Sequence, residues 1–182
     1  MKKQTLALIS LALIIIMALA SCSGTKMTMG TGGTGGTYYG FGSVIGQYIE
    51  KNAGIGCVPV STDGSKANIQ GIEAGDYQLG TVQSDVMAYA WAGTNTFADD
   101  GKVDSFRVIG GLYAECVQII TNDSSIKSVA DLKGKTVSIG APGSGVYFNA
   151  IDVLTAAGLT LEDIKPQYQS FNDSAESIKD ER

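Results

Sequence analysis

The sequence has no histidine and, among its 182 residues, only two arginines, Arg107 and Arg182. The absence of histidine excludes Ser-His-Asp and Cys-His nucleophiles and every His-ligated metal site. Acidic residues outnumber lysine and arginine by 18 to 13, which gives a net charge of -5. This balance argues against nucleic acid as a partner, because nucleic acids are bound mainly through lysine and arginine. We therefore expect neither a metal site nor a nucleic-acid-binding function.

Proline is also scarce, with three residues, whereas glycine is abundant, with 24. The glycines show no collagen-type period and indicate tight turns and close backbone approaches. Hydrophobic residues make up 44% of the chain and charged residues 17%, which is typical of a globular protein rather than a disordered chain. The length suffices for one domain or a small pair of domains.

The N-terminal segment has the pattern of a secretory signal. Two lysines precede an apolar run over Leu6–Leu19, and small residues follow before Cys22. The run is shorter than the about 20 apolar residues that a membrane-spanning helix needs. The segment resembles a bacterial lipoprotein signal, in which an acylated cysteine becomes the mature N-terminus. We predict a signal peptide over residues 1–21, lipidation at Cys22 and a tether over 22–27, with an ordinary cleaved signal or an anchor helix as alternatives.

Two further cysteines, Cys57 and Cys116, follow the predicted signal. Both lie in short apolar contexts that are typical of strands. In an oxidising compartment the two thiols can pair as a disulfide. We favour the alternative, in which both are buried small hydrophobic residues.

Beyond the tether, short apolar strands alternate with Gly/Ser/Thr turns and amphipathic helices. This alternation predicts parallel sheets covered by helices, an α/β fold. Two further apolar runs, 106–113 and 117–121, follow a polar loop, and Asn172 or Ser174 is expected to cap a last polar helix. We expect strands over 26–29, 57–60, 78–82, 136–139 and 165–168.

Four turns place glycine, serine or threonine directly before a predicted helix, at residues 31–37, 63–65, 83–85 and 142–145. Free backbone N–H groups and the positive end of the helix dipole attract anions, and glycine lets a ligand approach closely. In a parallel α/β sheet such turns meet at the carboxyl ends of the strands, where ligands bind. The turns therefore predict an anion site that does not depend on arginine, which is scarce in this chain. Helix capping is the alternative explanation for each turn taken alone.

The first of these turns also matches the G-x-G-x-x-G pattern of dinucleotide-binding enzymes, through Gly30, Gly32 and Gly35. Asp63 lies farther along than the about 20 residues at which such enzymes place their ribose-binding acid. No lysine follows the glycines, which excludes a P-loop. An exported dinucleotide-dependent α/β oxidoreductase is thus an alternative function. Export argues against it, because nicotinamide cofactors are cytoplasmic.

Five motifs then occur in a fixed order along the chain. They are TGGTGGTYY at 31–39, TDGSKANI at 62–69, QSDV at 83–86, VADLKGK at 129–135 and GAPGSG at 140–145. From about residue 28 to the C-terminus this series resembles the TAXI family of solute receptors for TRAP transporters.

The resemblance implies a two-lobed, hinged periplasmic-binding-protein fold of type II. Its first lobe would span 28–115, and 116–182 would begin the second. It implies an extracytoplasmic lipoprotein without catalytic activity or cofactor. Such a receptor captures a small organic anion, of the glutamate/glutamine or keto/dicarboxylic acid class, and delivers it to a sodium-driven TRAP membrane permease.

Carried over motif by motif, the resemblance implies that the anion lies between the two lobes. Asp85 is the one acid in the implied site, where it can accept a ligand amine or stabilise the start of its own helix. The implied ligand-binding residues are Thr34, Gly35, Tyr38, Ser65, Asn68, Gln83, Ser84, Asp85, Ser144, Gly145 and Asn149.

The C-terminal part of the sequence contains few strands for a complete second lobe. No strand pattern follows the last predicted helix, and members of the TAXI family are considerably longer than this chain. We therefore expect a chain truncated in its second lobe. A sensory lipoprotein that uses the same fold without transport is a further alternative.

Overall fold

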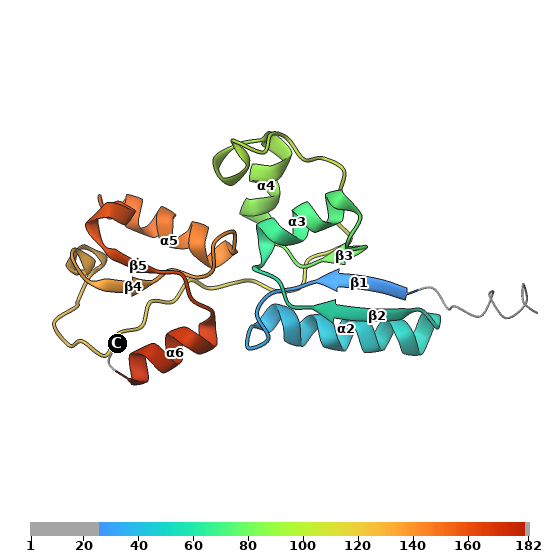
Figure 1. Cartoon of the computed structure of the whole chain (residues 1–182), viewed down its shortest axis with the longest axis horizontal. Coiled ribbons are helices and arrows are strands. Elements are labelled where there is room, and N and C mark those ends of the chain that lie inside the picture. The colour runs from blue at the N-terminus through green and yellow to red at the C-terminus, as the bar shows by residue number, and fades with distance from the viewer. Residues whose placement is uncertain (1–25, 181–182) are drawn as a thin grey trace, which may run out of the picture.

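Two separate parallel β-sheets form the framework of the computed structural model, which describes residues 26–180 (Figure 1). The first sheet has the strand order β2-β1-β3, and the second pairs β4 with β5. Helices alternate with these strands, which confirms the predicted α/β class. The predicted signal peptide, Cys22 and most of the tether lie outside the described residues. The strands are β1 (Lys26–Gly30), β2 (Gly56–Val60), β3 (Leu79–Gly80), β4 (Thr136–Ser138) and β5 (Lys165–Gln167).

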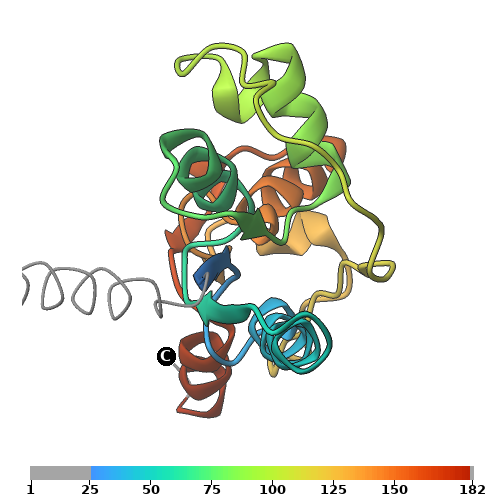
Figure 2. The ribbon, with the colours of Figure 1, turned by 90° about the vertical axis from the view of Figure 1, so that its right-hand side faces the viewer.

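Helices cover both faces of each sheet. In the first sheet α2 lies on one face and α3 and α4 on the other, and a view turned by 90° shows α2 and α3 on opposite sides of β1 (Figures 1 and 2). In the second sheet α5 and α6 lie on opposite sides (Figure 1). None of the helices in residues 26–180 has the length and apolar character to cross a bilayer. The helices are α2 (Thr37–Ala53), α3 (Ser65–Ala74), α4 (Ser84–Ala92), α5 (Gly145–Ala156) and α6 (Phe171–Lys179), with 3-10 turns at Asn95–Phe97, Val129–Leu132 and Leu161–Asp163.

Local sequence signals set most of the helix ends. Gly75 and Gly93 end α3 and α4 in the left-handed conformation, with φ of 83° and 66°, where glycine carries no steric cost. Ser144 caps α5 as predicted, because its hydroxyl accepts the N–H of Tyr147. The start of the last helix was predicted wrongly: Ser170 caps α6, rather than Asn172 or Ser174.

Two apolar clusters hold these elements together. The second cluster lies within the second sheet and its helices, and includes Ile139, Leu154 and Ile164. In the first cluster, Phe148 of α5 packs among residues of α3 and α4, so the two halves of the chain share a core. Its buried members are Ile69, Val86, Ala90, Phe97, Val103 and Phe148.

The two apolar runs at 106–113 and 117–121 form no strand in the structure. Ile109 and Ile120 are 85% and 71% exposed, and no other described segment pairs with this part of the backbone. An apolar pattern produces a strand only where a neighbouring strand supplies hydrogen-bond partners. The same segment leaves Cys116 exposed, which contradicts the prediction that both cysteines are buried. Cys57 is buried as predicted, and the two thiols are not joined in a disulfide.

Candidate ligand-binding cleft

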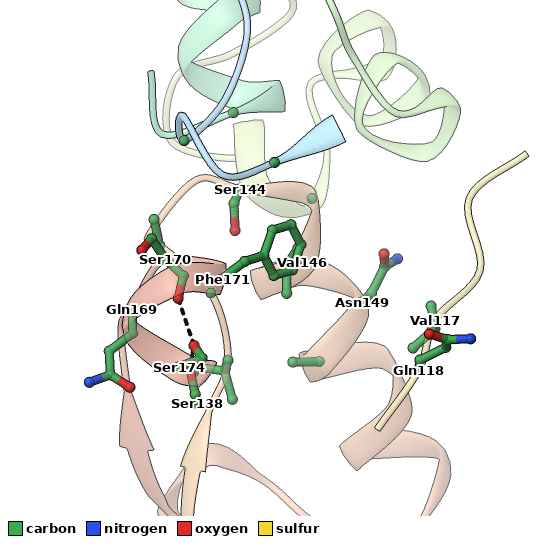
Figure 3. Close-up of a pocket in the computed structure, with 18 of the residues that line it drawn as sticks. Val117, Gln118, Ser138, Ser144, Val146, Asn149, Gln169, Ser170, Phe171 and Ser174 are labelled. Atoms are coloured by element: carbon green, nitrogen blue, oxygen red, sulfur yellow. Dashed lines mark hydrogen bonds between the residues drawn. The ribbon is translucent and has the colours of Figure 1, made fainter. Parts of the chain in front are cut away.

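A cleft of about 1880 Å³ lies where the carboxyl ends of the strands in the two sheets face one another. Its walls are the turns that follow β1, β2, β4 and β5, together with the extended segment 113–122. The volume exceeds the about 300–1,000 Å³ of an ordinary small-molecule pocket, because the cleft continues along that segment. Figure 3 shows Ser144, Ser170 and Phe171 gathered at one part of the cleft, with Asn149 on α5 facing the side of Val117 and Gln118.

The starts of five helices border this cleft, because Gln83, the N-cap of α4, lines it together with the starts of α2, α3, α5 and α6. α2 begins after Gly36 and α3 after Gly64, and neither N-cap supplies a side chain that hydrogen-bonds the first turn. By contrast, Ser144 and Ser170 cap α5 and α6 with their hydroxyls. A glycine N-cap leaves backbone N–H groups at the helix start available to an outside acceptor. The N-terminus of α2 is therefore the better candidate for binding an anion, because in α3 the N–H of Lys66 already donates to the carbonyl oxygen of Gly143.

Two contacts close one side of the cleft between the halves of the chain. The N–H of Lys66 in α3 donates to the carbonyl oxygen of Gly143 at 3.0 Å. The Nε2 of Gln83 donates to the Oδ1 of Asn149 in α5 at 3.0 Å. Gln83 also lies directly against Gly145, where any Cβ would overlap its carboxamide. These contacts position the N-terminus of α5 opposite that of α3.

A third contact joins the turn before α2 to the start of α6. The carboxamide of Asn172 packs against the backbone at Gly35, in space that a Cβ would occupy. Phe171 lies beside Gly36, and Ser170 beside Gly33. Glycine is thus required at position 35 for the approach of the two halves as well as for access to the backbone.

Ser65 links the second and third predicted turns. Its side chain is fully buried, and its Oγ accepts the N–H of Gln83 at 3.1 Å. This hydrogen bond ties the start of α3 to the start of α4, so the two turns form one wall of the cleft.

Most of the residues implied by the sequence motifs lie together along the cleft. Asn68, Ser84 and Asp85 do not line it. Ser84 is exposed at the start of α4, and Asp85 accepts hydrogen bonds from the N–H of Val86 and, at 3.3 Å, from Asn149. The lining includes Thr34, Gly35, Tyr38, Ser65, Gln83, Ser144, Gly145 and Asn149.

Asn68 has a structural position instead of the ligand contact expected from its motif. The side chain is fully buried, and its Nδ2 donates to the carbonyl oxygens of Thr31 and Thr81 at 2.6 and 2.8 Å. Its Oδ1 accepts the hydroxyl of Thr62 at 2.7 Å. These partners follow β1, β3 and β2 in turn, so Asn68 holds the three strand ends together from α3.

Sequence reasoning missed Tyr113 and Glu115, which line the cleft beside Tyr38. The hydroxyls of Tyr38 and Tyr113 donate to the two oxygens of the Glu115 carboxylate at 3.4 and 3.3 Å. Burial, reinforced by the charge of Glu115, raises the pKa of Tyr113 to about 12 and that of Tyr38 higher still. One signal was present in the sequence: Glu115 is the one charged residue within the apolar stretch 108–121.

The cleft contains no basic side chain among the described residues that line it, whereas Asp63 and Glu115 are acidic. The backbone of Lys66 lies at the edge of the cleft. Its ammonium group, however, pairs with Asp100 and lies 5.1 Å from the ring centroid of Phe97. Within residues 26–180 no group of three or more Cys, Asp or Glu side chains is placed to hold a metal ion. The site therefore offers backbone amides, hydroxyls, carboxamides and two carboxylates.

Comparison with known proteins finds a matching family and solved structures with a similar fold. A model of the NMT1-like family matches residues 29–182. The alkanesulfonate-binding protein SsuA from Xanthomonas axonopodis pv. citri, bound to MOPS, has a similar structure, with a TM-score of 0.55, 19% identity, and 86% of this chain and 52% of that chain covered. The periplasmic aliphatic sulphonate binding protein SsuA from Escherichia coli gives a TM-score of 0.50, 20% identity, and coverage of 87% and 49%. The chain has the periplasmic-binding-protein fold and spans about half the length of these two proteins.

Proposed function

Because the chain belongs to the NMT1-like family, we propose that it is an extracytoplasmic solute receptor that binds a small organic anion in the cleft. The observation that carries this proposal is the meeting of helix N-termini, two of them with glycine N-caps, at the carboxyl ends of strands from both sheets. This arrangement binds negative charge without a cation. The cleft needs no chemical step for that role, so the proposed protein is a receptor rather than an enzyme.

The proposed solute is a small carboxylate of the amino-acid or keto-acid class. Hydrogen bonds from backbone amides to a charged group contribute about 1.5–3 kcal/mol each, so several must converge to give micromolar affinity. The SsuA proteins carry the names of sulfonate binders, and a sulfonate, like a carboxylate, is a singly charged group whose oxygens accept hydrogen bonds. An alkanesulfonate therefore belongs in any ligand panel beside L-glutamate, L-glutamine and 2-oxoglutarate.

The dinucleotide alternative loses support from the packing around its glycines. A Cβ at Gly30 would lie 2.5 Å from Oδ1 of Asn68. At Gly35 the carboxamide of Asn172 takes the space that a Cβ would need. Contacts within the protein therefore account for glycine at two of the three positions of the dinucleotide pattern.

Delivery of the solute to a sodium-driven TRAP permease is the proposed role in the cell. Its support is the ordered series of five TAXI-type motifs, four of which form turns that line the cleft or its edge. A sensory role without transport uses the same binding site. Uptake into proteoliposomes that contain the permease and a sodium gradient separates the two, because only delivery makes uptake depend on the receptor.

Lipid anchoring at Cys22 is proposed from the signal pattern alone. Cells that express the chain and are labelled with radioactive palmitate should incorporate label into this protein. The Cys22→Ser variant should lose the label, whereas Cys116→Ser, which removes an exposed thiol elsewhere, should keep it. Equal labelling of all three proteins would contradict the anchor.

Ser65→Ala should weaken binding of the best carboxylate in the panel by about tenfold or more. The substitution removes a buried hydroxyl from the wall of the cleft, and one hydrogen bond to a charged ligand contributes about 1.5–3 kcal/mol. Titration calorimetry measures the dissociation constant, and a thermal melt without ligand records the cost of the lost bond to Gln83.

Ser84→Ala is the matched control, because Ser84 begins the next helix but is exposed and outside the lining. Its affinity should equal that of the unsubstituted protein. Equal affinities for all three proteins would refute the role of Ser65. Stabilisation by a nicotinamide dinucleotide alone, with no response to any anion, would refute the receptor.

A further inference from the structure

Residues 106–121 cross from the first sheet to the second as an extended segment that belongs to neither sheet (Figure 1). None of its N–H or carbonyl groups forms a backbone hydrogen bond with the rest of the described chain. Its apolar side chains are also open to solvent, with Val108 and Ile109 64% and 85% exposed. An extended segment with unpaired backbone groups is a template for a strand from another chain, so this segment is a candidate interface.

The outer face of α2 continues this exposed apolar surface. The ring of Tyr113 lies against the ring of Phe41, with centroids 5.0 Å apart. Phe41 and Val44 are 41% and 66% exposed, and with Thr37 and Gly40 they line a hollow of about 570 Å³. A strand that lies along the segment at Tyr113 therefore also covers apolar surface on α2, which favours association.

The charges of the segment indicate which strand fits it. Arg107 and Glu115 are the two charged residues within 106–121, and they carry opposite signs. Neither forms an ion pair with another described residue, and the Nη1 of Arg107 donates only to nearby backbone carbonyl oxygens. Because the two are eight positions apart, they lie on the same face of an extended strand. A second copy that runs in the opposite direction supplies both matching charges.

One antiparallel register satisfies both charges at once. When two copies pair about Gly111, Arg107 of each copy lies opposite Glu115 of the other. In the same register Ile109 lies opposite Tyr113, and a β-branched residue opposite an aromatic one is a favourable cross-strand pair. A two-fold axis at Gly111 repeats each of these pairs, as the self-complementary interface of a symmetric dimer requires.

We propose that the chain forms a two-fold symmetric dimer in which residues 107–115 of the two copies pair as antiparallel strands. Ile109 of one copy then covers Tyr113 and the hollow on α2 of the other. Because Glu115 also lines the cleft, each copy brings an arginine to the edge of its partner's cleft. The dimer goes beyond the proposed function and does not rest on it.

Sedimentation equilibrium of the full chain tests the dimer by charge reversal. The unsubstituted protein should show a monomer–dimer equilibrium with a Kd on the order of micromolar. Arg107→Glu and Glu115→Arg should each weaken it by about tenfold or more, because each turns two attractive pairs into two repulsive ones. The variant with both substitutions restores opposite charges and should dimerise like the unsubstituted protein.

Lys165→Glu is the matched control, since it makes the same change of charge at an exposed position in β5, outside the segment. It should leave the dimer unchanged. A monomer at every concentration overturns the proposal, and so does a double variant no better than the two single ones. An equal loss in Lys165→Glu also overturns it, because association would then follow net charge alone. Circular dichroism of each variant confirms that the fold is kept.

A disulfide across the two-fold axis tests the register independently of charge. A Cβ at Gly110 or Gly111 would meet no other heavy atom within 4 Å. In a background with Cys116→Ser, mild oxidation of Gly111→Cys should therefore join two copies, because position 111 faces itself. Gly110→Cys faces Leu112 and should be joined at least several-fold more slowly. Equal rates for the two variants would overturn the register and indicate unspecific association of the exposed segment.

Discussion

Replacement of Asn68 by aspartate is expected to lower the free energy of unfolding by about 3 kcal/mol or more. The two side chains have nearly the same shape, but aspartate has no N–H groups for the carbonyl oxygens of Thr31 and Thr81. A carboxylate oxygen would face both carbonyls in a fully buried position. The loss therefore combines unpaired acceptors with the burial of a charge.

Urea unfolding followed by circular dichroism measures this loss. Asn52→Asp is the matched control, since Asn52 lies exposed near the end of α2 and donates only to the carbonyl oxygen of Tyr48. Its effect should stay within about 0.5 kcal/mol, as for most surface substitutions. An Asn68→Asp protein as stable as the control, but unable to bind its solute, would restore Asn68 to the ligand site that its motif implied.

Gly46→Ala is expected to destabilise the protein by about 1–3 kcal/mol, although alanine is the better helix former. A Cβ at position 46 would lie 2.5 Å from the carbonyl oxygen of Cys57 in β2. This atom belongs to the backbone of a paired strand, so it cannot move aside as a flexible side chain would. Either α2 or the edge of the first sheet must shift, and the contact between them is lost in part.

Gly40→Ala in the same helix provides the control. No heavy atom lies within 4 Å of the Cβ that it would add. The variant should be unchanged or up to about 1 kcal/mol more stable, because alanine has the higher helix propensity. Urea midpoints for the two variants should therefore move in opposite directions. A Gly46→Ala protein as stable as Gly40→Ala would show that α2 does not approach β2 as closely as the structure places it.

Local patterns were sufficient for the elements whose ends depend on short-range chemistry. Gly75 and Gly93 stop their helices because a left-handed residue is needed directly after the last turn. Ser144 begins α5 because its hydroxyl reaches an N–H three residues ahead. The predicted meeting of turns at one cleft followed from the rule that parallel strands present their carboxyl ends together.

Elements that depend on distant partners were not predictable in this way. The runs at 106–113 and 117–121 have the composition of strands, but no described strand lies beside them. Asn68 belongs to a motif that resembles a ligand-binding turn, yet three strand ends surround it. Glu115 became a candidate for the site only when Tyr38, 77 positions earlier in the chain, was found to donate to it.

By itself, the sequence determined the α/β class, the helix starts that border the cleft and the exclusion of histidine chemistry, because each depends on residue type and short spacing. Tertiary structure decided which polar side chains face the cleft and which hold the strands together. It also decided the sign of the charge inside the cleft. Those properties depend on which distant residues become neighbours, and spacing along the chain does not encode that directly. The acidic lining of the cleft, formed by Asp63 and Glu115, is therefore a feature that only the folded chain discloses.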